Sequence, residues 1–429
     1  MWCLDGSVKI LQCTESLGGS VTDDGSLTLE VLTLSGLNLQ ESYSLPECSA
    51  AGSESSDSVR EALQAGDDVE WDNCALGTPF LASRAVRVAV LCPETGTLSV
   101  FETSGEGEPV LRSLYSVALG GRPSECFAIG DLDSNGEQDI AIAFPADNQV
   151  SIYWDFVPER AALRTTVKTG ISPTHVSIGA LGGGQGAFVA VLCQLNPHVE
   201  LLVGWSENRR PLEPRRLPLP GLATALGVLD LDQDGTDDIL LGSSVGQQLF
   251  ALALDPTGLL RLRDTLSVPT ARALGIAMTP RTSVAAVSAG DRYAALLVGE
   301  GCILVVRLAA DGPLQAVFQW NDEQLAVSDV VFADVSNDGL VDLVVGYRSQ
   351  RSILVFRGTA SGFNAKPWVS IVSGEPRSMA AADLDADGSE DLLVLCSEGT
   401  LDVLWGESGT SYGLARIGQI LLCAGVAQH

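Results

Sequence analysis

Basic residues are scarce in this chain. Its 429 residues contain 25 lysines and arginines against 54 aspartates and glutamates, which gives a formal net charge of −29. Proteins that bind the phosphate backbone of nucleic acids need a basic face, so this balance argues against a nucleic-acid partner. With only three histidines and three lysines, the chain also has few groups for acid–base catalysis.

Several familiar signals are missing as well. No apolar stretch reaches the ~18 residues that a membrane-spanning helix needs. The first residues, MWCLDGSVKIL, lack the basic end and apolar core of a secretory signal, which leaves open a cytosolic chain or a trimmed form. There is no N-x-Ser/Thr glycosylation site, and no GxSxG, HExxH or CxxC motif. A hydrolase of the common motif classes and a zinc site are therefore not expected.

Ten cysteines are present. Cys92, Cys193 and Cys396 end similar apolar runs, so we expect them to be small core residues of different repeats that do not pair. Cys48 and Cys74 flank an acidic, serine-rich insertion at 48–74, with a short helix expected at 59–65, and a disulfide between them is one possibility in an oxidising compartment.

The chain is rich in glycine, with 45 residues, and aromatic residues make up 6%. This composition is typical of many short strands joined by tight turns. Acidic loops begin at Asp131, Asp230, Asp334 and Asp383, which lie 99, 104 and 49 residues apart. Two spacings are about twice the third, so a repeat of about 50 residues is predicted, with weaker copies at 176–193 and 274–299.

Each repeat has apolar strands around its loop and a more polar fourth strand. Such a pattern predicts radial four-stranded sheets with buried inner strands and a wet outer edge. The expected fold is all-β: a single β-propeller of seven four-stranded blades over 75–420. The blades are expected at 75–121, 122–170, 171–219, 220–267, 268–322, 323–371 and 372–420. Residues 1–47 resemble part of another repeat, so an eighth blade, with Leu421–Ala427 closing the ring, remains an alternative.

The acidic loops place oxygen-bearing side chains at positions one, three, five and nine, and a glycine at position six. Such a set suits calcium, which prefers six to eight oxygen ligands. Asp–Gly turns of ordinary hairpins would explain one loop, but not four in the same phase. The predicted ligands, with position seven acting through its backbone carbonyl, are Asp131, Asp133, Asn135, Glu137 and Asp139; Asp230, Asp232, Asp234, Thr236 and Asp238; Asp334, Ser336, Asp338, Leu340 and Asp342; and Asp383, Asp385, Asp387, Ser389 and Asp391. The third loop should bind most weakly because Ser336 is neutral.

These repeats resemble the FG-GAP/VCBS repeat of integrin α-subunit propellers, and the copy at 127–154 carries the closest pattern. The resemblance covers roughly 75–420 and is specific in the four acidic repeats. It implies about four structural Ca²⁺ ions on one face and a protein or glycan ligand on the other. Fold alone does not fix the function of such propellers.

The leading prediction is a non-catalytic, calcium-binding adhesion or binding module with no membrane span, located outside the cytoplasm, where calcium is abundant. The alternatives are a polysaccharide-lyase-like enzyme or accessory domain, and a cytosolic scaffold subunit. Two further features are explained by the fold without a ligand. The arginine-rich segment 208–216 reads as an exposed loop before the next blade, although it could bind an anion, and Trp154, Trp205 and Trp405 read as packing between blades.

Overall fold

The computed structural model describes part of the chain. The described residues are 17–21, 27–31, 74–77, 79–82, 85–104, 110–155, 164–182, 186–193, 198–205, 209, 211–219, 222–243, 248–255, 259–268, 273–278, 292–298, 302–308, 312–322, 326–385, 387–397, 399–406 and 416–421.

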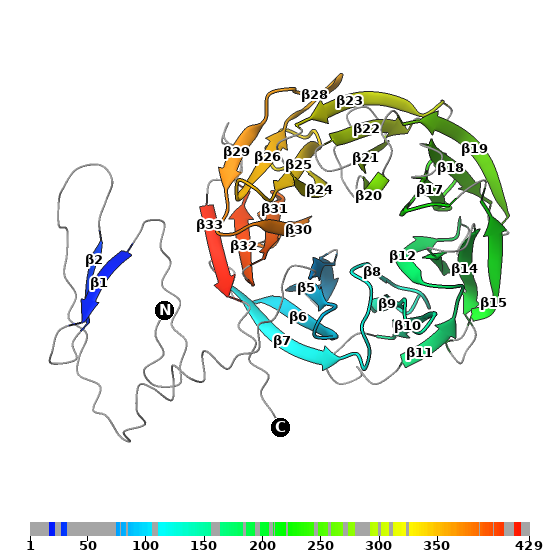
Figure 1. Ribbon diagram of the computed structural model, residues 1–429, viewed down its shortest axis with the longest axis horizontal. Helices are drawn as coiled ribbons and strands as arrows, with labels where there is room; N and C mark the ends of the chain where they lie inside the picture. The colour runs from blue at the N-terminus through cyan, green and yellow to red at the C-terminus, as the bar shows by residue number, and fades with distance from the viewer. Residues whose placement is uncertain are drawn as a thin grey trace.

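Seven antiparallel sheets stand around a central axis as the blades of a propeller (Figure 1). The strands of each blade follow one another along the chain, interrupted only in the sixth blade by a short hairpin, so the chain completes one blade before starting the next. From the innermost strand outward, the blades are β3 (Ala75–Leu76) with β4 (Phe80–Ala82), β5 (Ala85–Cys92), β6 (Thr97–Ser104) and β7 (Val110–Ala118); β8 (Phe127–Gly130), β9 (Asp139–Phe144), β10 (Gln149–Tyr153) and β11 (Arg164–Lys168); β12 (Pro173–Ala180), β13 (Ala187–Cys193), β14 (His198–Trp205) and β15 (Pro211–Pro218); β16 (Ala225–Leu229), β17 (Asp238–Ser243), β18 (Gln248–Leu254) and β19 (Leu260–Ser267); β20 (Ala273–Met278), β21 (Arg292–Val298), β22 (Cys302–Leu308) and β23 (Gln315–Asn321); β24 (Val327–Ala333), β25 (Asp342–Tyr347), β26 (Ser352–Phe356) and β29 (Trp368–Ile371); and β30 (Pro376–Ala382), β31 (Asp391–Cys396), β32 (Thr400–Trp405) and β33 (Arg416–Leu421).

The predicted seven blades and their four-strand layout are confirmed. Two short hairpins lie outside the seven blade sheets: β27 (Gly358–Thr359) pairs β28 (Gly362–Phe363), and β1 (Leu17–Val21) pairs β2 (Leu27–Val31). The strands β1 and β2 pair only with each other, so no eighth blade occurs among the described residues. The tail expected to close the ring, apart from Leu421, lies outside the described residues, as does the helix expected at 59–65.

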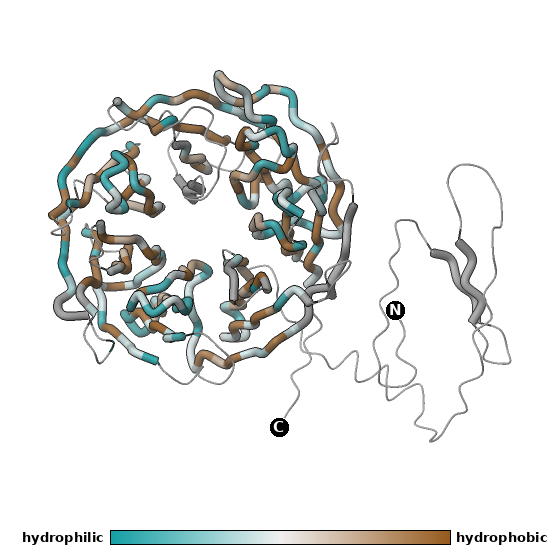
Figure 2. The backbone as a smooth tube through the Cα atoms, turned by 180° about the vertical axis from the view of Figure 1, so that it is seen from behind, coloured by the Kyte–Doolittle hydropathy of each residue, from teal (hydrophilic) through white to brown (hydrophobic). Residues whose placement is uncertain are grey.

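Burial follows position within the blade. Second strands are buried along their whole length, as in β9, β17, β25 and β31, because both of their faces contact neighbouring blades. Outer strands alternate between exposed and half-buried residues, as in β11 and β29. Figure 2 shows the same trend as apolar inner segments joined by hydrophilic turns. None of the described segments forms a helix long and apolar enough to cross a membrane.

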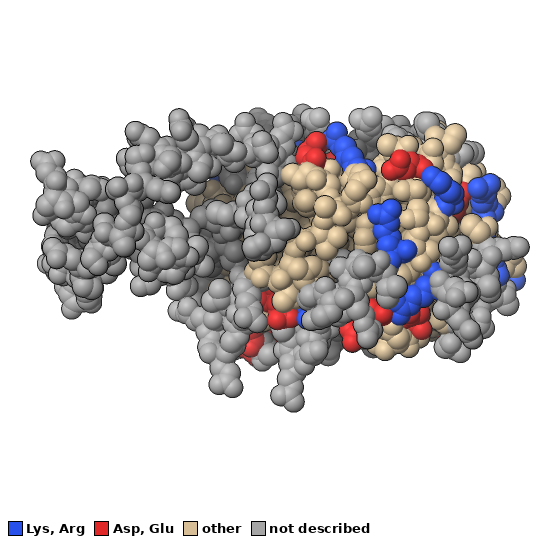
Figure 3. Space-filling model, turned by 90° about the horizontal axis from the view of Figure 1, so that it is seen from below, with Lys and Arg blue, Asp and Glu red and all other residues tan. Residues whose placement is uncertain are grey.

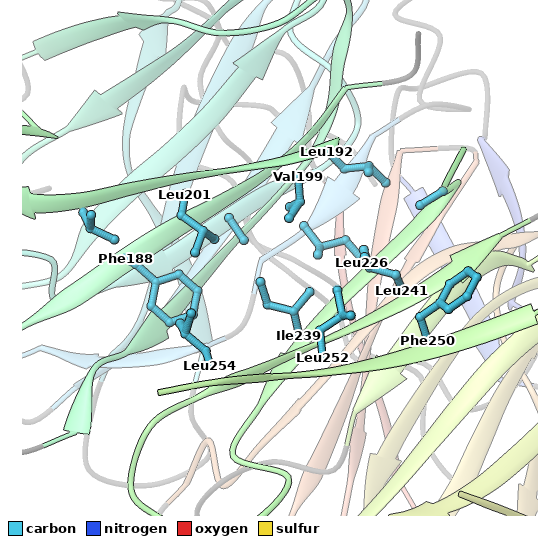
Figure 4. Close-up of a cluster of buried hydrophobic side chains, with 13 residues drawn as sticks. Phe188, Leu192, Val199, Leu201, Leu226, Ile239, Leu241, Phe250, Leu252 and Leu254 are labelled. Atoms are coloured by element: carbon cyan, nitrogen blue, oxygen red, sulfur yellow. The ribbon is translucent and has the colours of Figure 1, made fainter. Parts of the chain in front are cut away.

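The hydrophobic core is divided among the interfaces between blades. Between the third and fourth blades, Phe188 and Leu201 pack against Ile239 and Leu252 from the neighbouring sheet (Figure 4). Between the second and third blades, the rings of Trp154 and Trp205 meet edge to face with centroids 5.4 Å apart. The interpretation of these tryptophans as packing between blades is therefore confirmed, and Trp405 likewise packs against the cluster shared by the last and first blades.

The first and last blades close the ring through their innermost strands. Leu76 of β3 donates its backbone N–H to Ser378 Oγ of β30, 3.1 Å away. Ser378 Oγ in turn donates to Asp329 Oδ2 of the preceding blade, 3.3 Å away. These contacts join three consecutive blades by hydrogen bonds at the point where the two ends of the ring meet.

One cysteine expectation is wrong. Cys74 forms a disulfide with Cys92 and not with Cys48, because the pairing of β3 with β5 brings the two Cα atoms within 4.3 Å. Cys92 is therefore not a free core residue, whereas Cys193 and Cys396 are free and buried as expected. The error arose because β3 is only two residues long and begins immediately after Cys74, so the sequence does not show that this cysteine starts a strand.

Candidate metal centres

Each acidic loop joins the first strand of a blade to the second. We name them loop 1 (131–139, β8 to β9), loop 2 (230–238, β16 to β17), loop 3 (334–342, β24 to β25) and loop 4 (383–391, β30 to β31). Because all blades run their strands in the same order and direction, these loops lie on one face of the propeller. The connections from third to fourth strands lie on that same face.

The loops share one backbone conformation. Their position-six residues, Gly136, Gly235, Gly339 and Gly388, have φ values of 89°, 89°, 84° and 91°. Few other residues adopt this conformation without strain, so glycine is required there. The residue at position four is also left-handed in loops 1, 2 and 3, at Ser134, Gln233 and Asn337. The chain therefore curls around the space toward which the acidic side chains converge.

The first carboxylate of each loop holds this curl in place. In loop 4, Asp383 accepts the backbone N–H groups of Asp387 and Gly388 at 3.1 and 3.0 Å. In loop 1, Asp131 accepts the corresponding groups of Asn135 and Gly136 at 3.1 and 2.9 Å. The position-five side chain then accepts the N–H at position seven in all four loops. Local acceptors of this kind stabilise turns without any ion.

The position-nine aspartate ties each loop to the blade. Asp238 is 1% exposed, and its two carboxylate oxygens accept the N–H groups of Leu231, in the loop, and Leu254, at the end of the third strand. Asp139 and Asp391 make the same pair of bonds in their own blades. Asp342 also accepts two backbone N–H groups, but its donor within the loop is Ser336, at position three. This residue, predicted only as a ligand, is therefore also a buried structural acceptor.

Burial raises the pKa of all four position-nine carboxyl groups to about 7. The cause is desolvation, which disfavours the charged form. Hydrogen bonds from the two backbone N–H groups oppose it, while neighbouring aspartates of the same loop raise the pKa further. A cation among these carboxylates would relieve the repulsion.

Loops 1, 2 and 4 gather carboxylates closely enough to share one ion. Three oxygen atoms lie within 4.8 Å of one another in each of the groups Asp131, Asp133 and Asp139; Asp230, Asp232 and Asp234; and Asp383, Asp385 and Asp391. Within the described residues, loop 3 forms no such group. Ser336 occupies its third position in place of a carboxylate. That this loop binds calcium most weakly stays a prediction.

The donor chemistry fits a hard cation. Asp133 Oδ1, Asp230 Oδ1 and Ser336 Oγ are buried without a hydrogen-bond partner, and an unpartnered buried oxygen is costly unless something binds it. All the side-chain atoms that could bind a metal in these loops are oxygens, which calcium prefers over nitrogen or sulfur as ligands. The loop residues therefore fit calcium, and Asp133, Asp230 and Ser336 would present their unpartnered oxygens to it.

Arginines contact two of the loops. Arg209, between β14 and β15, reaches into the neighbouring blade, where its Nε lies 3.0 Å from Asp133 Oδ2 and its Nη2 lies 2.7 Å from Asp155 Oδ2. Arg357, just after β26, places its Nη2 2.5 Å from Asp338 Oδ2 in loop 3. Sequence reasoning missed both residues, because neither lies within an acidic loop.

Contacts between neighbouring loops use positions seven and eight. Glu390 of loop 4 accepts the backbone N–H of Asp334, the first residue of loop 3, at 2.5 Å. Asp237 of loop 2 accepts the N–H of Ala180, which occupies the same place in the third blade, at 2.7 Å. At position seven, Thr236 accepts the N–H of Gly182, 3.2 Å away. The adjacent acidic pairs 237–238 and 390–391 were the available sequence signal for this contact.

The third blade shows what a loop without acids becomes. Its connection from β12 to β13 carries glycine and alanine where the other loops have carboxylates. A Cβ at Gly182, which stands where loop 1 has Asp133, would lie 2.7 Å from Thr236 Oγ1. The adjacent blade fills this space, so we assign no ion here. In the fifth blade, the corresponding connection lies outside the described residues.

The arginine-rich segment 208–216, predicted to be an exposed loop, is exposed at 214–216 but is mainly a strand. Residues 211–218 form β15, the outer strand of the third blade. Arg216 pairs with the buried Glu200 at 2.9 Å, and Arg209 pairs with loop 1. Viewed edge-on, the described surface shows acidic and basic side chains side by side (Figure 3). Because Arg209 and Arg216 both have partners within the protein, the segment gives no support for an anion site.

Comparisons with known proteins agree with this fold. The model of the FG-GAP-like repeat matches residues 334–394, which include loops 3 and 4. No curated protein sequence matches the chain closely enough to count as a relative. Among solved structures, a Bacteroides fragilis protein named provisionally as a 6-phosphogluconolactonase aligns with a TM-score of 0.53 and 14% identity, covering 81% of this chain and 94% of its own. A Lactobacillus plantarum protein aligns with a TM-score of 0.51 and 14% identity, covering 81% and 95%.

At these identities, the solved structures show the fold alone. The family match is more specific, because it begins at the first aspartate of loop 3 and ends within β31 after loop 4. It therefore falls on the repeat unit recognised from the acidic loops. Together with the seven blades, it supports a β-propeller of the FG-GAP/VCBS repeat type.

Proposed function

We propose that this chain is a non-catalytic, calcium-stabilised propeller that serves as a binding or adhesion module for a protein or glycan partner. The observation that carries the calcium proposal is the arrangement of loops 1, 2 and 4, in which three carboxylates converge on a curled backbone. Ions bound there would neutralise acids that otherwise repel one another beside the buried second strands.

The role assigned to calcium is structural. Each loop connects the innermost strand of a blade to a fully buried strand, and its ninth residue bonds to the end of the third strand. An ion in the loop would therefore fix three strands relative to one another. The opposite face, formed by the connections between second and third strands and between blades, is then left for a partner.

The proposed location is extracellular, periplasmic or at the cell surface. The Cys74–Cys92 disulfide supports an oxidising compartment, since such bonds are rare in the cytosol. Free calcium outside the cytoplasm is also high enough to fill sites of modest affinity. An experiment that counts free thiols in protein purified without reductant tests this proposal, because a cytosolic protein would keep Cys74 and Cys92 reduced.

Calcium binding is tested by measuring metal content and thermal unfolding of the native protein, with calcium and after chelation. We expect bound calcium and a melting temperature that falls on chelation and recovers when calcium, but not magnesium, is restored. A matched pair of variants locates the effect: Asp232→Asn should remove much of the calcium response, and Asp147→Asn, at an exposed position in the turn between β9 and β10, should not. If the protein binds no metal and its melting temperature does not respond to calcium, the loops are acidic turns and not ion sites.

The partner proposal needs its own test. The intact, calcium-loaded protein would be applied to a glycan array. In a separate experiment, it would be crosslinked to surface proteins of the cells that produce it. Binding lost after substitutions on the face opposite loops 1–4, with the melting temperature unchanged, would support a ligand on that face. Turnover of a polysaccharide by the purified protein would instead favour an enzyme.

A further inference from the structure

We propose that Arg209 and Arg357 are built-in counter-ions that weaken calcium binding at loops 1 and 3, so that loops 2 and 4 are the tight sites. The inference rests on the proposed calcium function and divides the loops into two classes. Its basis is that an arginine side chain already contacts a predicted calcium ligand in each of loops 1 and 3.

In loop 1 the guanidinium comes from the neighbouring blade. Arg209 contacts Asp133, at the third position of the loop, and Asp155, which is 2% exposed. Its guanidinium also lies 5.3 Å from the centre of the Trp154 ring, which favours a cation over that face. Because ring and carboxylates hold it together, the arginine is positioned before any ion arrives.

In loop 3 the guanidinium comes from the same blade. Arg357 follows β26 and contacts Asp338, at the fifth position of the loop. It lies 5.2 Å from the centre of the Trp368 ring. Thus the same combination of arginine, tryptophan and loop carboxylate is reached from a different part of the fold, which makes a chance contact a poor explanation.

Loops 2 and 4 differ in charge as well as in contacts. Each offers four side-chain carboxylates at positions one, three, five and nine, whereas loops 1 and 3 offer three, because Asn135 and Ser336 are neutral. Within the part of the chain that the structure describes, no lysine or arginine pairs with a ligand of loop 2 or loop 4.

The formal charges follow by addition. Loops 2 and 4 carry −4 each from their ligands. Loop 3 carries −3 from Asp334, Asp338 and Asp342, which Arg357 reduces to −2. Loop 1 carries −3 from its ligands and −1 from the adjacent Asp155, which Arg209 reduces to −3. Since calcium affinity in oxygen sites rises with the number of charged ligands, two classes of site are expected.

The arginines also supply what calcium would otherwise supply. The positive guanidinium group beside Asp133 or Asp338 offsets the repulsion among the acidic side chains of that loop. Loops 1 and 3 should therefore stay folded without calcium, and the calcium dependence of the propeller should be concentrated in the fourth and seventh blades, which hold loops 2 and 4.

Calorimetric calcium titration of the metal-stripped full chain tests this division. We expect wild-type protein to show a tight class of sites, removed by Asp232→Asn with Asp385→Asn, and a weaker class. The double variant Arg209→Gln with Arg357→Gln should tighten only the weaker class, by about tenfold or more. The control Arg122→Gln removes an exposed arginine that pairs with Glu94 away from the loops, and it should change neither class.

The charge-conserving variant Arg209→Lys separates charge from packing. We expect it to leave the weaker class close to wild type, with folding of every variant checked by circular dichroism. If wild type binds calcium and the affinity of the weaker class is the same in Arg209→Gln with Arg357→Gln, the counter-ion role is overturned. The proposed function is then unaffected. An absence of calcium binding in wild type and in all variants would overturn the proposed function, and the inference with it.

Discussion

Loops 2 and 4 differ from loops 1 and 3 in two respects, although all four share one backbone conformation. All four curl in the same way around a glycine with φ near 90°, and all four anchor a buried aspartate to two backbone N–H groups. Only loops 1 and 3 have replaced a carboxylate and acquired an arginine. The backbone conformation of the loop is therefore independent of how many charged ligands it offers to a cation.

The largest effect should come from the part that all four loops share. Asp238→Ala leaves two buried N–H groups without an acceptor, so we expect it to lower the free energy of unfolding by about 2–5 kcal/mol. Asp139→Ala in loop 1 should cost a similar amount. Chemical denaturation in chelator measures both, and a loss that appears only with calcium present would assign position nine to the metal alone.

Removal of calcium should distinguish the two classes. A site filled at a hundredfold excess over its dissociation constant stabilises the folded state by about 2.7 kcal/mol. We expect Asp232→Asn or Asp385→Asn to abolish much of this gain, whereas Asp133→Asn should abolish little. Melting curves with and without calcium give the comparison, and equal losses at loops 1 and 2 would remove the distinction between them.

The pH dependence of the calcium-free protein should be inverted relative to common carboxylates. The pKa of Asp238 and of Asp391 is about 7 in the folded state, above the usual 3.8. The folded state then holds more protons than the unfolded state between these values. The stability that these groups contribute is therefore full below about pH 3.8 and is lost as the pH rises through about 7. Denaturation at several pH values in chelator measures this fall, and saturating calcium should flatten it.

The smallest effect should be that of the arginines on the calcium-free protein. Arg209→Gln removes a quarter-exposed ion pair and a contact with Trp154, so we expect a loss of about 1 kcal/mol. Arg122→Gln should change stability by less than about 0.5 kcal/mol. If Arg209→Gln instead stabilises the calcium-free protein, the arginine is not a counter-ion.

The repeat made most of the fold predictable. Spacings of about 50 residues between acidic loops indicated seven blades, with an eighth as the alternative, and the polar fourth strand of each repeat indicated the strand order. The boundaries that failed lie where the pattern is interrupted. One example is β3, a two-residue strand whose preceding cysteine pairs within the same blade.

The candidate sites were predictable only in their local part. Positions one to nine are contiguous in sequence, so their convergence could be inferred from ligand spacing. Arg209 lies about 75 residues after Asp133 and meets it only because consecutive blades are neighbours in the ring. Glu390 reaches Asp334 for the same reason. Such contacts depend on the stacking of blades, which cannot be predicted from a local sequence motif.

The most direct measurement is a crystal structure of the calcium-loaded protein, with anomalous scattering used to locate each ion. We expect ions at full occupancy in loops 2 and 4, bound by the aspartates of positions one, three and five. At limiting calcium, loops 1 and 3 should show lower occupancy, with Arg209 and Arg357 still on their carboxylates. Equal occupancy in all four loops would contradict the two classes, and four loops without ions would contradict the calcium-stabilised propeller itself.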